Sequence, residues 1–439
     1  MSGDADVVAD SSVAVPDSSD AVGPADARDS RYESDAVVDV PAPDVIDAGR
    51  IDAPIDPTCP AAAKAYGALW CRSLRSKTSW YSLQTVGPRG ETIVANDVVY
   101  AVDSDGAMLW SYAPPTRNPL IAIDPSGAFS TAAPWIGSID DVHDPRVIER
   151  RDPSASVLWS KSVPHPFGFS PGLVVLAVAT DRAGRTIVLG THAVIDDPSG
   201  VVDLGGGPLP FGASFIISFE SDGRVRWQRA LGYHVLSNAS TLATAPDGDV
   251  VMGATLADKA EVGGPMPVGS GPFSHDQVFV RWHDDGAFAW SKTYPGEGGS
   301  IAPTLAISPT DGRIVYFSDV MHMTALDASG RELWRKAVSS TPGCSGTGVA
   351  RVGGSIAFDP HGALHVAGQW QDAGCTITFG GPPISAPQGF VVDLDENGAF
   401  LGQVTGAIEI QDYGSLSVAP DATLRVLDKD GLLMKLPAR

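Results

Sequence analysis

The chain has 439 residues, with 52 acidic and 30 basic side chains and a formal net charge of −22 at pH 7. This acidic balance argues against nucleic acid and anionic membrane as partners, because neither would find a basic surface. No run of 18 or more apolar residues occurs, so the sequence predicts no membrane-spanning helix.

Residues 1–58 differ in composition from the rest of the chain. They contain 14 acidic residues, three arginines, no lysine and one aromatic residue, Tyr32. So few bulky apolar groups cannot offset the entropy that is lost on ordering. We therefore expect a disordered acidic tether over 1–58, followed by one folded domain over 59–439.

Two kinds of turn signal alternate from residue 88 onward. In the first kind, a polar residue precedes a Gly by three positions, and a Trp follows that Gly by four. The copies are Asp103/Gly106/Trp110, Asp152/Ala155/Trp159, Glu220/Gly223/Trp227, His283/Gly286/Trp290, Asp327/Gly330/Trp334 and Asp395/Gly398/Gly402, of which the second lacks the Gly and the last lacks the Trp. An Asp side chain can bond the backbone two residues later, and Gly accepts the positive φ that closes such a turn.

The second kind of turn signal precedes an apolar strand. Its seven copies are 88–90, 124–127, 181–184, 246–248, 309–312, 359–362 and 420–422. Each pair of signals describes a four-stranded antiparallel unit, in which two tight turns flank one variable connection. Seven such units predict an all-β fold, a seven-bladed β-propeller.

The predicted blades follow one another in chain order. They cover 80–112, 119–162, 173–230, 240–293, 303–337, 354–404 and 415–436. The last blade lacks an outer strand, and the segment 67–74 (GALWCRSL) reads like the outer strand at 330–338 (GRELWRKAV). We expect this N-terminal strand to complete the last blade and close the ring, which removes exposed sheet edges.

The four cysteines fall into two pairs that are local in this arrangement, Cys59/Cys71 and Cys344/Cys375. The first bridge would attach the tether to the closing strand, and the second would join two loops of the sixth blade. Two disulfides are expected, and free buried thiols are the alternative. Neither pair has the short spacing of zinc ligands.

The connections inside blades 3, 4 and 6 share a core, LGGGPLP (204–210), VGGPMP (262–267) and FGGPPIS (379–385). With the strings VFVRWHDDGAFAWSKTY and FIISFESDGRVRWQRAL, this core resembles the β-propeller repeats of secreted or surface proteins of myxobacteria and related bacteria. The string VVYAVDSDGAMLWSY additionally resembles a quinoprotein-type propeller repeat. The resemblance covers roughly 80–436 and implies the fold and an extracytoplasmic setting, with no activity attached.

The acidic tether bears on localisation. The acidic tether is similar to the region after the lipidated cysteine of bacterial lipoproteins, so we expect a secreted, periplasmic or surface-anchored protein, with a lipid-anchored precursor as one form. The signal segment for export is absent from this sequence. A cytoplasmic protein with an acidic tail is the alternative.

The expected binding site lies on one face of the ring. The tight turns are uniform, whereas the other connections vary up to about twenty residues and should emerge on the opposite face, where a rigid scaffold presents them. The candidate ligand-binding residues in these connections are Trp135, Asp141, His143, Asp144, His192, Tyr233, His234, His275, Tyr294, Trp370, Asp372 and Tyr413.

Several of these residues have alternative interpretations. The cluster 140–144 (DDVHD) could bind a cation, but a solvated polar loop is the expected outcome, and no metal site is predicted. The repeated tryptophans at fixed spacing indicate packing between blades rather than sugar stacking. Trp135, Tyr233, Tyr294 and Trp370 fall outside that spacing and are the better stacking candidates.

Motifs for catalysis are missing: the sequence contains no G-x-S-x-G, no H-E-x-x-H and no phosphate-binding P-loop. The adjacent-cysteine disulfide typical of quinoproteins is also missing, so no cofactor is predicted. We expect a non-catalytic, monomeric binding or scaffold protein that recognises a protein or a glycan on its long-loop face. The alternative is a polysaccharide lyase or hydrolase with carboxylate and histidine acid–base groups at the central channel.

Overall fold

The computed structural model describes residues 59–60, 63, 68–74, 83–115, 119–133, 146–163, 173–192, 202–210, 212–233, 236–256, 258–271, 276–295, 304–317, 322–341, 353–370, 374–406, 416–428 and 431–438. All of them belong to one compact unit, Ala42–Arg439. The elements in these ranges are β-strands, so the all-β prediction is confirmed. Within the same ranges, no helix has the length and apolar character needed to cross a bilayer.

Seven four-stranded antiparallel sheets contain most of the strands. Sheet 1 consists of β2 (Leu83–Val86), β3 (Thr92–Ala95), β4 (Val99–Val102) and β5 (Met108–Tyr112), and sheet 2 of β6 (Leu120–Ile123), β7 (Phe129–Ala132), β8 (Arg146–Arg151) and β9 (Val157–Val163). Sheet 3 consists of β10 (Val174–Thr180), β11 (Thr186–Thr191), β14 (Ala213–Phe219) and β15 (Val225–Tyr233), and sheet 4 of β16 (Leu236–Thr244), β17 (Val250–Leu256), β18 (Asp276–Trp282) and β19 (Phe288–Tyr294).

The remaining three sheets follow the same order. Sheet 5 consists of β20 (Thr304–Ile307), β21 (Ile314–Phe317), β22 (His322–Leu326) and β23 (Glu332–Ala337), and sheet 6 of β25 (Gly353–Phe358), β26 (Leu364–Trp370), β29 (Gln388–Leu394) and β30 (Phe400–Gly406). Sheet 7 combines β31 (Leu416–Val418), β32 (Leu424–Leu427) and β33 (Leu432–Leu436) with β1 (Trp70–Ser73). Five short strands lie outside these sheets: β12 (Val202–Asp203), β13 (Pro208–Leu209), β24 (Ser339–Ser340), β27 (Thr376–Thr378) and β28 (Ile384–Ser385).

Sheet 7 joins the two ends of the folded unit. β1 pairs with β33 in an antiparallel register that places Trp70 opposite Lys435 and Cys71 opposite Met434. The backbone N–H of Leu69 extends this pairing to the Lys435 carbonyl at 2.7 Å. The predicted outer strand near residue 70 is therefore present, and it covers an edge of β33 that would otherwise be exposed.

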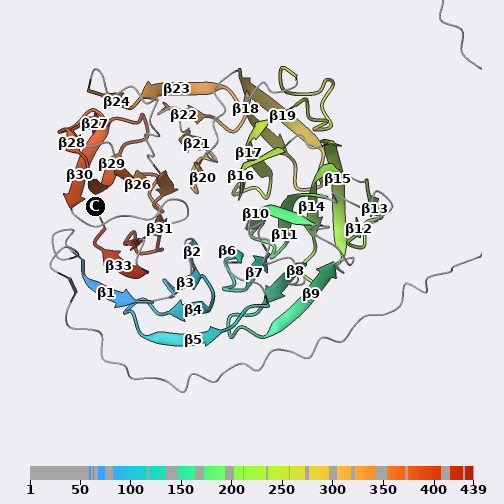
Figure 1. The fold of residues 1–439 in the computed structure, drawn as a ribbon, viewed down its shortest axis with the longest axis horizontal. Coiled ribbons are helices and arrows are strands. Elements are labelled where there is room, and N and C mark those ends of the chain that lie inside the picture. Colours follow the sequence, from blue (N-terminus) through green and yellow to red (C-terminus); the bar gives the residue numbers. More distant parts are fainter. Residues whose placement is uncertain are drawn as a thin grey trace, which may run out of the picture. The chain divides into compact units, whose positions relative to one another are not determined.

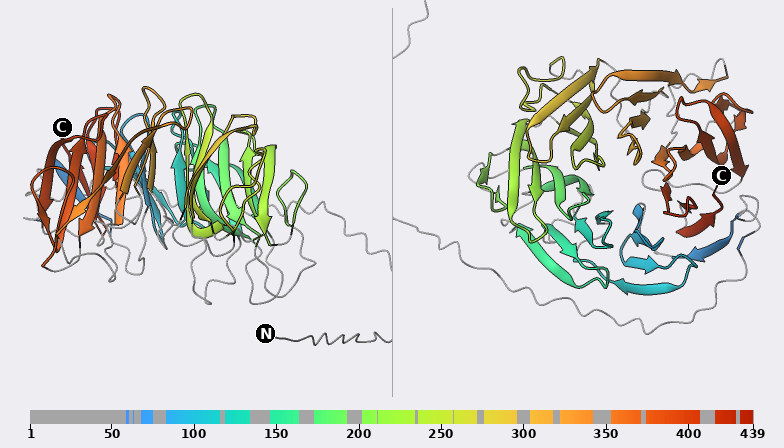
Figure 2. Two further views of the ribbon diagram at one scale, coloured as in Figure 1. Left: turned by 90° about the horizontal axis from the view of Figure 1, so that it is seen from above. Right: turned by 180° about the vertical axis from the view of Figure 1, so that it is seen from behind.

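The first strands of the sheets contact one another in chain order. β2 contacts β6, β6 contacts β10, β10 contacts β16, β16 contacts β20, β20 contacts β25, β25 contacts β31, and β31 contacts β2. Figure 1 shows these strands toward the middle of the unit and β5, β9, β15, β19 and β23 at its periphery. The edge-on view in Figure 2 shows the same sheets side by side.

The middle strands of each sheet are buried on both faces. In sheet 4, every residue of β17 and β18 is buried, whereas β19 is mostly half-buried. Burial on both faces requires a neighbouring sheet on each side, and it explains why these strands are rich in Val, Ile and Phe without polar alternation. The apolar core is therefore made between sheets.

Six tryptophans on outer strands connect six of the seven sheets to the next. The indole Nε1 of each donates to a backbone carbonyl in the last tight turn of the following sheet: Trp70 to Ser104, Trp110 to Pro153, Trp159 to Ser221, Trp227 to Asp284, Trp290 to Ala328 and Trp334 to Glu396, at 2.9–3.1 Å. The predicted packing role of the repeated tryptophans is confirmed. Between sheets 6 and 7 the equivalent position is Gly402, where the expected Trp is absent.

Glycine occupies most of the turns that a tryptophan covers. Gly286 has a φ of +82°, and a Cβ atom there would lie 2.7 Å from the Trp227 ring. The turn of sheet 2 departs from this pattern, because Ala155 occupies the position with a φ of +70° and is buried. This conformation costs an L-residue free energy that Gly avoids.

The opening residue of these turns acts as predicted. The Asp103 carboxylate accepts the backbone N–H groups of Asp105 and Ala107 at 2.9 and 2.8 Å. Asp428 accepts the N–H of Leu432 at 2.7 Å in the same way. These carboxylates are therefore used as caps of ordinary hairpin turns.

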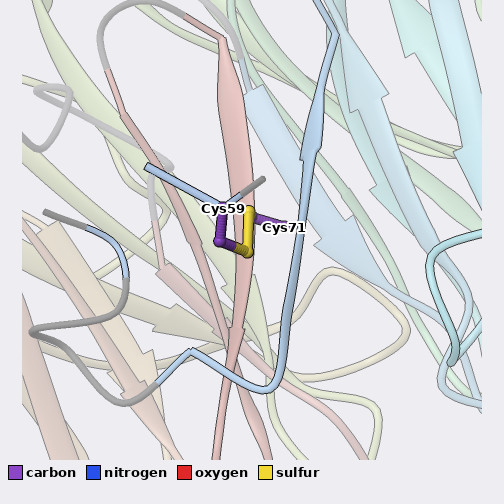
Figure 3. The surroundings of a disulfide bond; sticks show 2 residues. All are labelled: Cys59 and Cys71. Atoms are coloured by element: carbon purple, nitrogen blue, oxygen red, sulfur yellow. A yellow bond between two sulfur atoms is a disulfide. The ribbon is translucent and has the colours of Figure 1, made fainter. Parts of the chain in front are cut away.

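Cys59 and Cys71 form a disulfide, shown in Figure 3, which attaches the start of the described chain to β1. The first predicted bridge is thus present. Cys375 is also disulfide-bonded, while Cys344, its expected partner, lies outside the described residues. Within the described ranges there is no free cysteine.

Candidate functional site

Four of the twelve predicted ligand-binding residues lie within the described ranges, each at or next to the end of a strand. They are His192, Tyr233, Tyr294 and Trp370. Trp135, Asp141, His143, Asp144, His234, His275, Asp372 and Tyr413 lie outside the described residues. A long-loop site can therefore be assessed at four positions.

Two of these four side chains are fully buried. His192 follows β11, and its Nδ1 lies 3.2 Å from the Pro210 carbonyl. Trp370 ends β26, and its Nε1 donates to the Cys375 carbonyl at 3.1 Å. The Trp370 ring belongs to the apolar core between sheets 5 and 6, so it offers no exposed face for stacking on a ligand. Its role here is to anchor the connection that follows it.

Tyr294 is also held in the core. Its hydroxyl donates to Glu332 at 2.9 Å, and its ring packs edge-on against Phe279 and beside Tyr316. Burial raises the pKa of Tyr294 by disfavouring the phenolate, and Tyr316 and Glu332 raise it further. The ring therefore links sheets 4 and 5, which leaves it unavailable for stacking.

Tyr233 is the exposed member of the four. It ends β15, and 64% of its surface is accessible. Its ring covers Gly212, where an added Cβ would lie 2.1 Å from the ring. Of the described candidates, Tyr233 alone presents an aromatic ring to solvent at the long-loop end of a sheet.

The three glycine-rich connections fold as hairpins on the outer strands. Leu204, Val262 and Phe379 are buried anchors at equivalent places in the repeated core. In sheet 3 the hairpin is β12–β13, which lies outside β15 (Figure 1); in sheet 6 it is β27–β28. In sheet 4 an isolated bridge joins Ala260 to Val268. The sequence predicts these connections on the face opposite the tight turns, whereas their described parts lie at the periphery.

The hairpin of sheet 4 lies between the outer strands of two sheets. On one side, the N–H of Glu261 donates to the Leu231 carbonyl of β15 at 2.7 Å. Inside, the fully buried Trp282 of β18 donates its Nε1 to the Val262 carbonyl at 2.8 Å. The second glycine of the core, Gly264, passes so close to Phe288 that a Cβ would lie 2.9 Å from its ring.

A groove of about 560 Å³ separates the returning arm of this hairpin from β19. Its lining consists of Pro265, Met266, Pro267, Val268, Gly269, Ser270, Phe288, Ala289, Trp290, Ser291 and Thr293. The β19 residues include consecutive positions, whose side chains point to opposite faces of the sheet, so the groove follows the edge of the strand. Met266 is 74% exposed at its rim. We call this feature the β19 groove.

One residue beside the hairpin differs between sheets 3 and 4. In sheet 3 the residue after the outer-strand Trp is Gln228, and its Nε2 donates to the carbonyls of Gly206 and Gly207 in the hairpin at 2.8 and 3.1 Å. The equivalent residue in sheet 4 is Ser291, whose hydroxyl is too short to span the same gap. The hairpin and the outer strand are thus bridged in sheet 3 and separated in sheet 4.

A second groove of about 520 Å³ lies where sheet 5 meets sheet 6. Its walls include Trp334 and Lys336 of β23, Phe379 of the hairpin and Phe400 of β30. The Lys336 amine lies 5.7 Å from the centre of the Trp334 ring. In the equivalent place between sheets 3 and 4, the Arg229 guanidinium donates to the Gly286 carbonyl at 2.9 Å.

Carboxyl groups with lowered pKa values belong to turns and sheet junctions. A hydrogen bond from Arg185 of sheet 3 is the main cause that lowers the pKa of Asp284 in the turn before β19. Burial opposes ionisation of Asp327, but hydrogen bonds from Ser329 and Arg331 outweigh it and lower the pKa of Asp327 to about 2. Neither group lines a groove, and the described part of the chain holds no cluster of three or more metal-ligating residues.

The β19 groove was not predicted, although the sequence contains signals for it. The repeated G-G-P core marks the three hairpins, and the residue after the outer-strand Trp changes from Gln228 to Ser291. Recognising the groove required knowing that this position faces the hairpin. No protein-family model matches the sequence, and a search of curated proteins found no relative.

Proposed function

We propose that the chain is a seven-bladed β-propeller that binds a protein or a glycan without transforming it. The blade count is supported by the seven four-stranded sheets and by the contacts that run from β2 through each first strand to β31 and back to β2. Closure is supported by the pairing of β1 with β33 and by the Cys59–Cys71 disulfide at the same strand. This disulfide also supports an extracytoplasmic location, because such bonds persist in oxidising compartments.

The β19 groove is the observation that carries the binding function. It is lined mainly by apolar side chains, it borders the edge of a sheet, and it exposes Met266 at its rim. An exposed apolar groove is a candidate interaction site, because a ligand that covers it removes apolar surface from water, which is favourable. The scaffold around it is rigid, since Trp227 and Trp290 fix sheet 4 between its neighbours.

The test compares two surfaces of the full chain. The immobilised protein would be screened against a glycan array and a library of random peptides, and each ligand found would be measured against Met266→Asp and Tyr233→Ala. Met266→Asp should weaken binding by at least about tenfold, because it places a charge in the apolar groove. Loss on Tyr233→Ala alone would move the site to the long-loop face, and the absence of any ligand would contradict the binding function.

A further inference from the structure

We propose that the β19 groove accepts an extended peptide of a partner protein, which pairs as an additional strand with the outer edge of β19. This inference rests on the proposed binding function and specifies its ligand class. The partner segment is expected to be extended and apolar at alternate positions. Its backbone would be held by β19 on one side and by the hairpin on the other.

The outer edge of β19 is available to a further strand. β19 is the last strand of sheet 4, and no further strand pairs with its outer edge within the described residues. Such an edge presents a row of backbone N–H and C=O groups that can template an added strand. Because the groove is lined by Ala289, Trp290 and Ser291 in succession, it gives access to this edge along the strand.

The hairpins of sheets 4 and 6 each contact the sheet that precedes them. At β15 the N–H of Glu261, from the hairpin of the next sheet, donates to the Leu231 carbonyl. After β23 the short strand β24 pairs with β27, which belongs to the hairpin of sheet 6. The hairpin of the next sheet therefore bonds to the backbone of the outer strand in sheet 3, and to the backbone just after the outer strand in sheet 5. Sheet 5 has no such hairpin, because only the short segment 318–321 separates β21 from β22.

A side-chain amide fills the equivalent gap in sheet 3. There an amide, the side chain of Gln228, donates two hydrogen bonds to the hairpin carbonyls. Ser291 leaves the corresponding gap in sheet 4 unfilled. A peptide backbone supplies amide N–H groups of the same kind, so it can form the contacts in trans that Gln228 forms in cis.

The lining also favours a peptide over a glycan. No charged side chain and no side-chain amide lines the groove, and its side-chain hydroxyls come from Ser270, Ser291 and Thr293. A glycan would lose water from many hydroxyl groups with few partners to replace it, which is unfavourable. Apolar side chains of a peptide can instead contact Met266 and Trp290. Since no charge is involved, affinity should vary little with salt.

The experiment uses the full chain and a phage-displayed library of random peptides of about 10 residues, long enough to span the seven residues of β19. A selected peptide would be synthesised and its affinity measured for the native chain, Ser291→Gln and Gln228→Ser. Ser291→Gln fills the gap with the side chain that sheet 3 uses, so affinity should fall at least about tenfold. Gln228→Ser is the matched control in sheet 3 and should leave the affinity of the β19 groove unchanged, because at β15 the hairpin of sheet 4 already bonds to the Leu231 carbonyl.

A backbone readout separates strand pairing from simple apolar contact. The selected peptide would be N-methylated at one amide at a time. Pairing with β19 predicts the largest losses of affinity at every second amide, because alternate amides of a strand point to the same partner, and losses at the amides between only where they face a hairpin carbonyl. Uniform tolerance of methylation would overturn the proposal. The melting temperature of Ser291→Gln should match the native chain, which shows that the variant folds.

The remaining outcomes are also decisive. A glycan that binds the native chain and not Ser291→Gln would overturn the peptide assignment and leave the binding function intact. If the native chain is a dimer and Ser291→Gln is a monomer, the groove binds a second copy of this chain. That result would overturn the assignment to a separate partner protein. Failure to select any peptide or glycan would overturn both this inference and the proposed function.

Discussion

The hairpins of sheets 3 and 4 begin from the same repeated core and end in different surfaces. Both place a buried anchor, Leu204 or Val262, and then one glycine, Gly206 or Gly264, against the first residue of the outer strand. In sheet 3 the Gln228 amide joins the hairpin to β15, and in sheet 4 Ser291 leaves a groove of about 560 Å³. The two peripheries thus differ in whether the side chain after the outer-strand Trp bonds to the hairpin.

The scaffold under the two hairpins is nearly constant. Trp227 of sheet 3 and Trp290 of sheet 4 each donate to a carbonyl in the next sheet, at 3.0 and 2.9 Å, and each covers a glycine with positive φ. Such a division, with fixed contacts between sheets and variable contacts at the periphery, lets a repeat architecture change its surface without changing its core.

The largest effect is expected from truncating Trp282, which bonds to the hairpin of sheet 4. Trp282→Ala deletes a fully buried indole and its hydrogen bond to the Val262 carbonyl, so the free energy of unfolding should fall by about 3–5 kcal/mol. Sheet 3 carries Phe219 at this place, which makes Trp282→Phe the matched control with a smaller loss. Urea unfolding measures both; equal losses would contradict the anchoring role.

A smaller effect is expected where the two hairpins cross their outer strands. An added Cβ at Gly264 would lie 2.9 Å from the Phe288 ring, and one at Gly206 would lie 2.5 Å from the Gln228 side chain and 2.8 Å from a methyl group of Val225. Gly264→Ala and Gly206→Ala should therefore each cost about 1–3 kcal/mol, whereas Gly402→Ala, whose added Cβ would lie 3.6 Å from its nearest neighbour, should cost less. Thermal unfolding of the three variants tests this order, and a loss at Gly402→Ala as large as at the other two would contradict this packing.

The turn of sheet 2 offers a gain rather than a loss. Ala155 adopts a φ of +70°, whereas the equivalent positions in sheets 3 and 4 are glycines. Ala155→Gly removes strain of about 1–2 kcal/mol but makes the unfolded chain more flexible, so a net stabilisation of about 0.5 kcal/mol is expected. A lower melting temperature for this variant would mean that the Ala155 methyl group contributes more by packing than its conformation costs.

The smallest effect concerns the turns before the outer strands of sheets 5 and 4. The pKa of Asp327 is lowered to about 2, whereas sheet 4 has His283 at this place. A lowered pKa means that the ionised carboxylate stabilises the fold above the unfolded-state pKa near 4, and that this contribution disappears as pH falls toward 2. Asp327→Asn should therefore differ from the native chain at pH 5 and converge with it near pH 2 in denaturant unfolding. A constant difference would contradict the assignment.

The sequence predicted the strands and turns well because these depend on local chemistry. Turn residues such as Asp103 and Gly286 act within a few positions of the chain, and the Trp at fixed spacing reports on a contact that every sheet repeats. The closing strand could be predicted because its sequence copies an outer strand, and β1 does pair with β33.

Burial at the strand ends could not be predicted in the same way. Trp370 and Tyr294 look like exposed aromatics in the sequence, yet Trp370 is covered by the connection that it anchors and Tyr294 by β23 and its neighbours. The groove depends on the distance between Ser291 and a hairpin some twenty residues away in sequence. Such contacts are set by packing, and a periodic pattern does not report them.

The most direct measurement is amide hydrogen exchange of the full chain with and without a selected peptide. If the peptide joins sheet 4, exchange should slow in β19 and in the hairpin arm at 265–270, and Ser291→Gln should abolish this protection. Protection that appears instead at the end of β15 around Tyr233, or that persists in Ser291→Gln, would contradict the account.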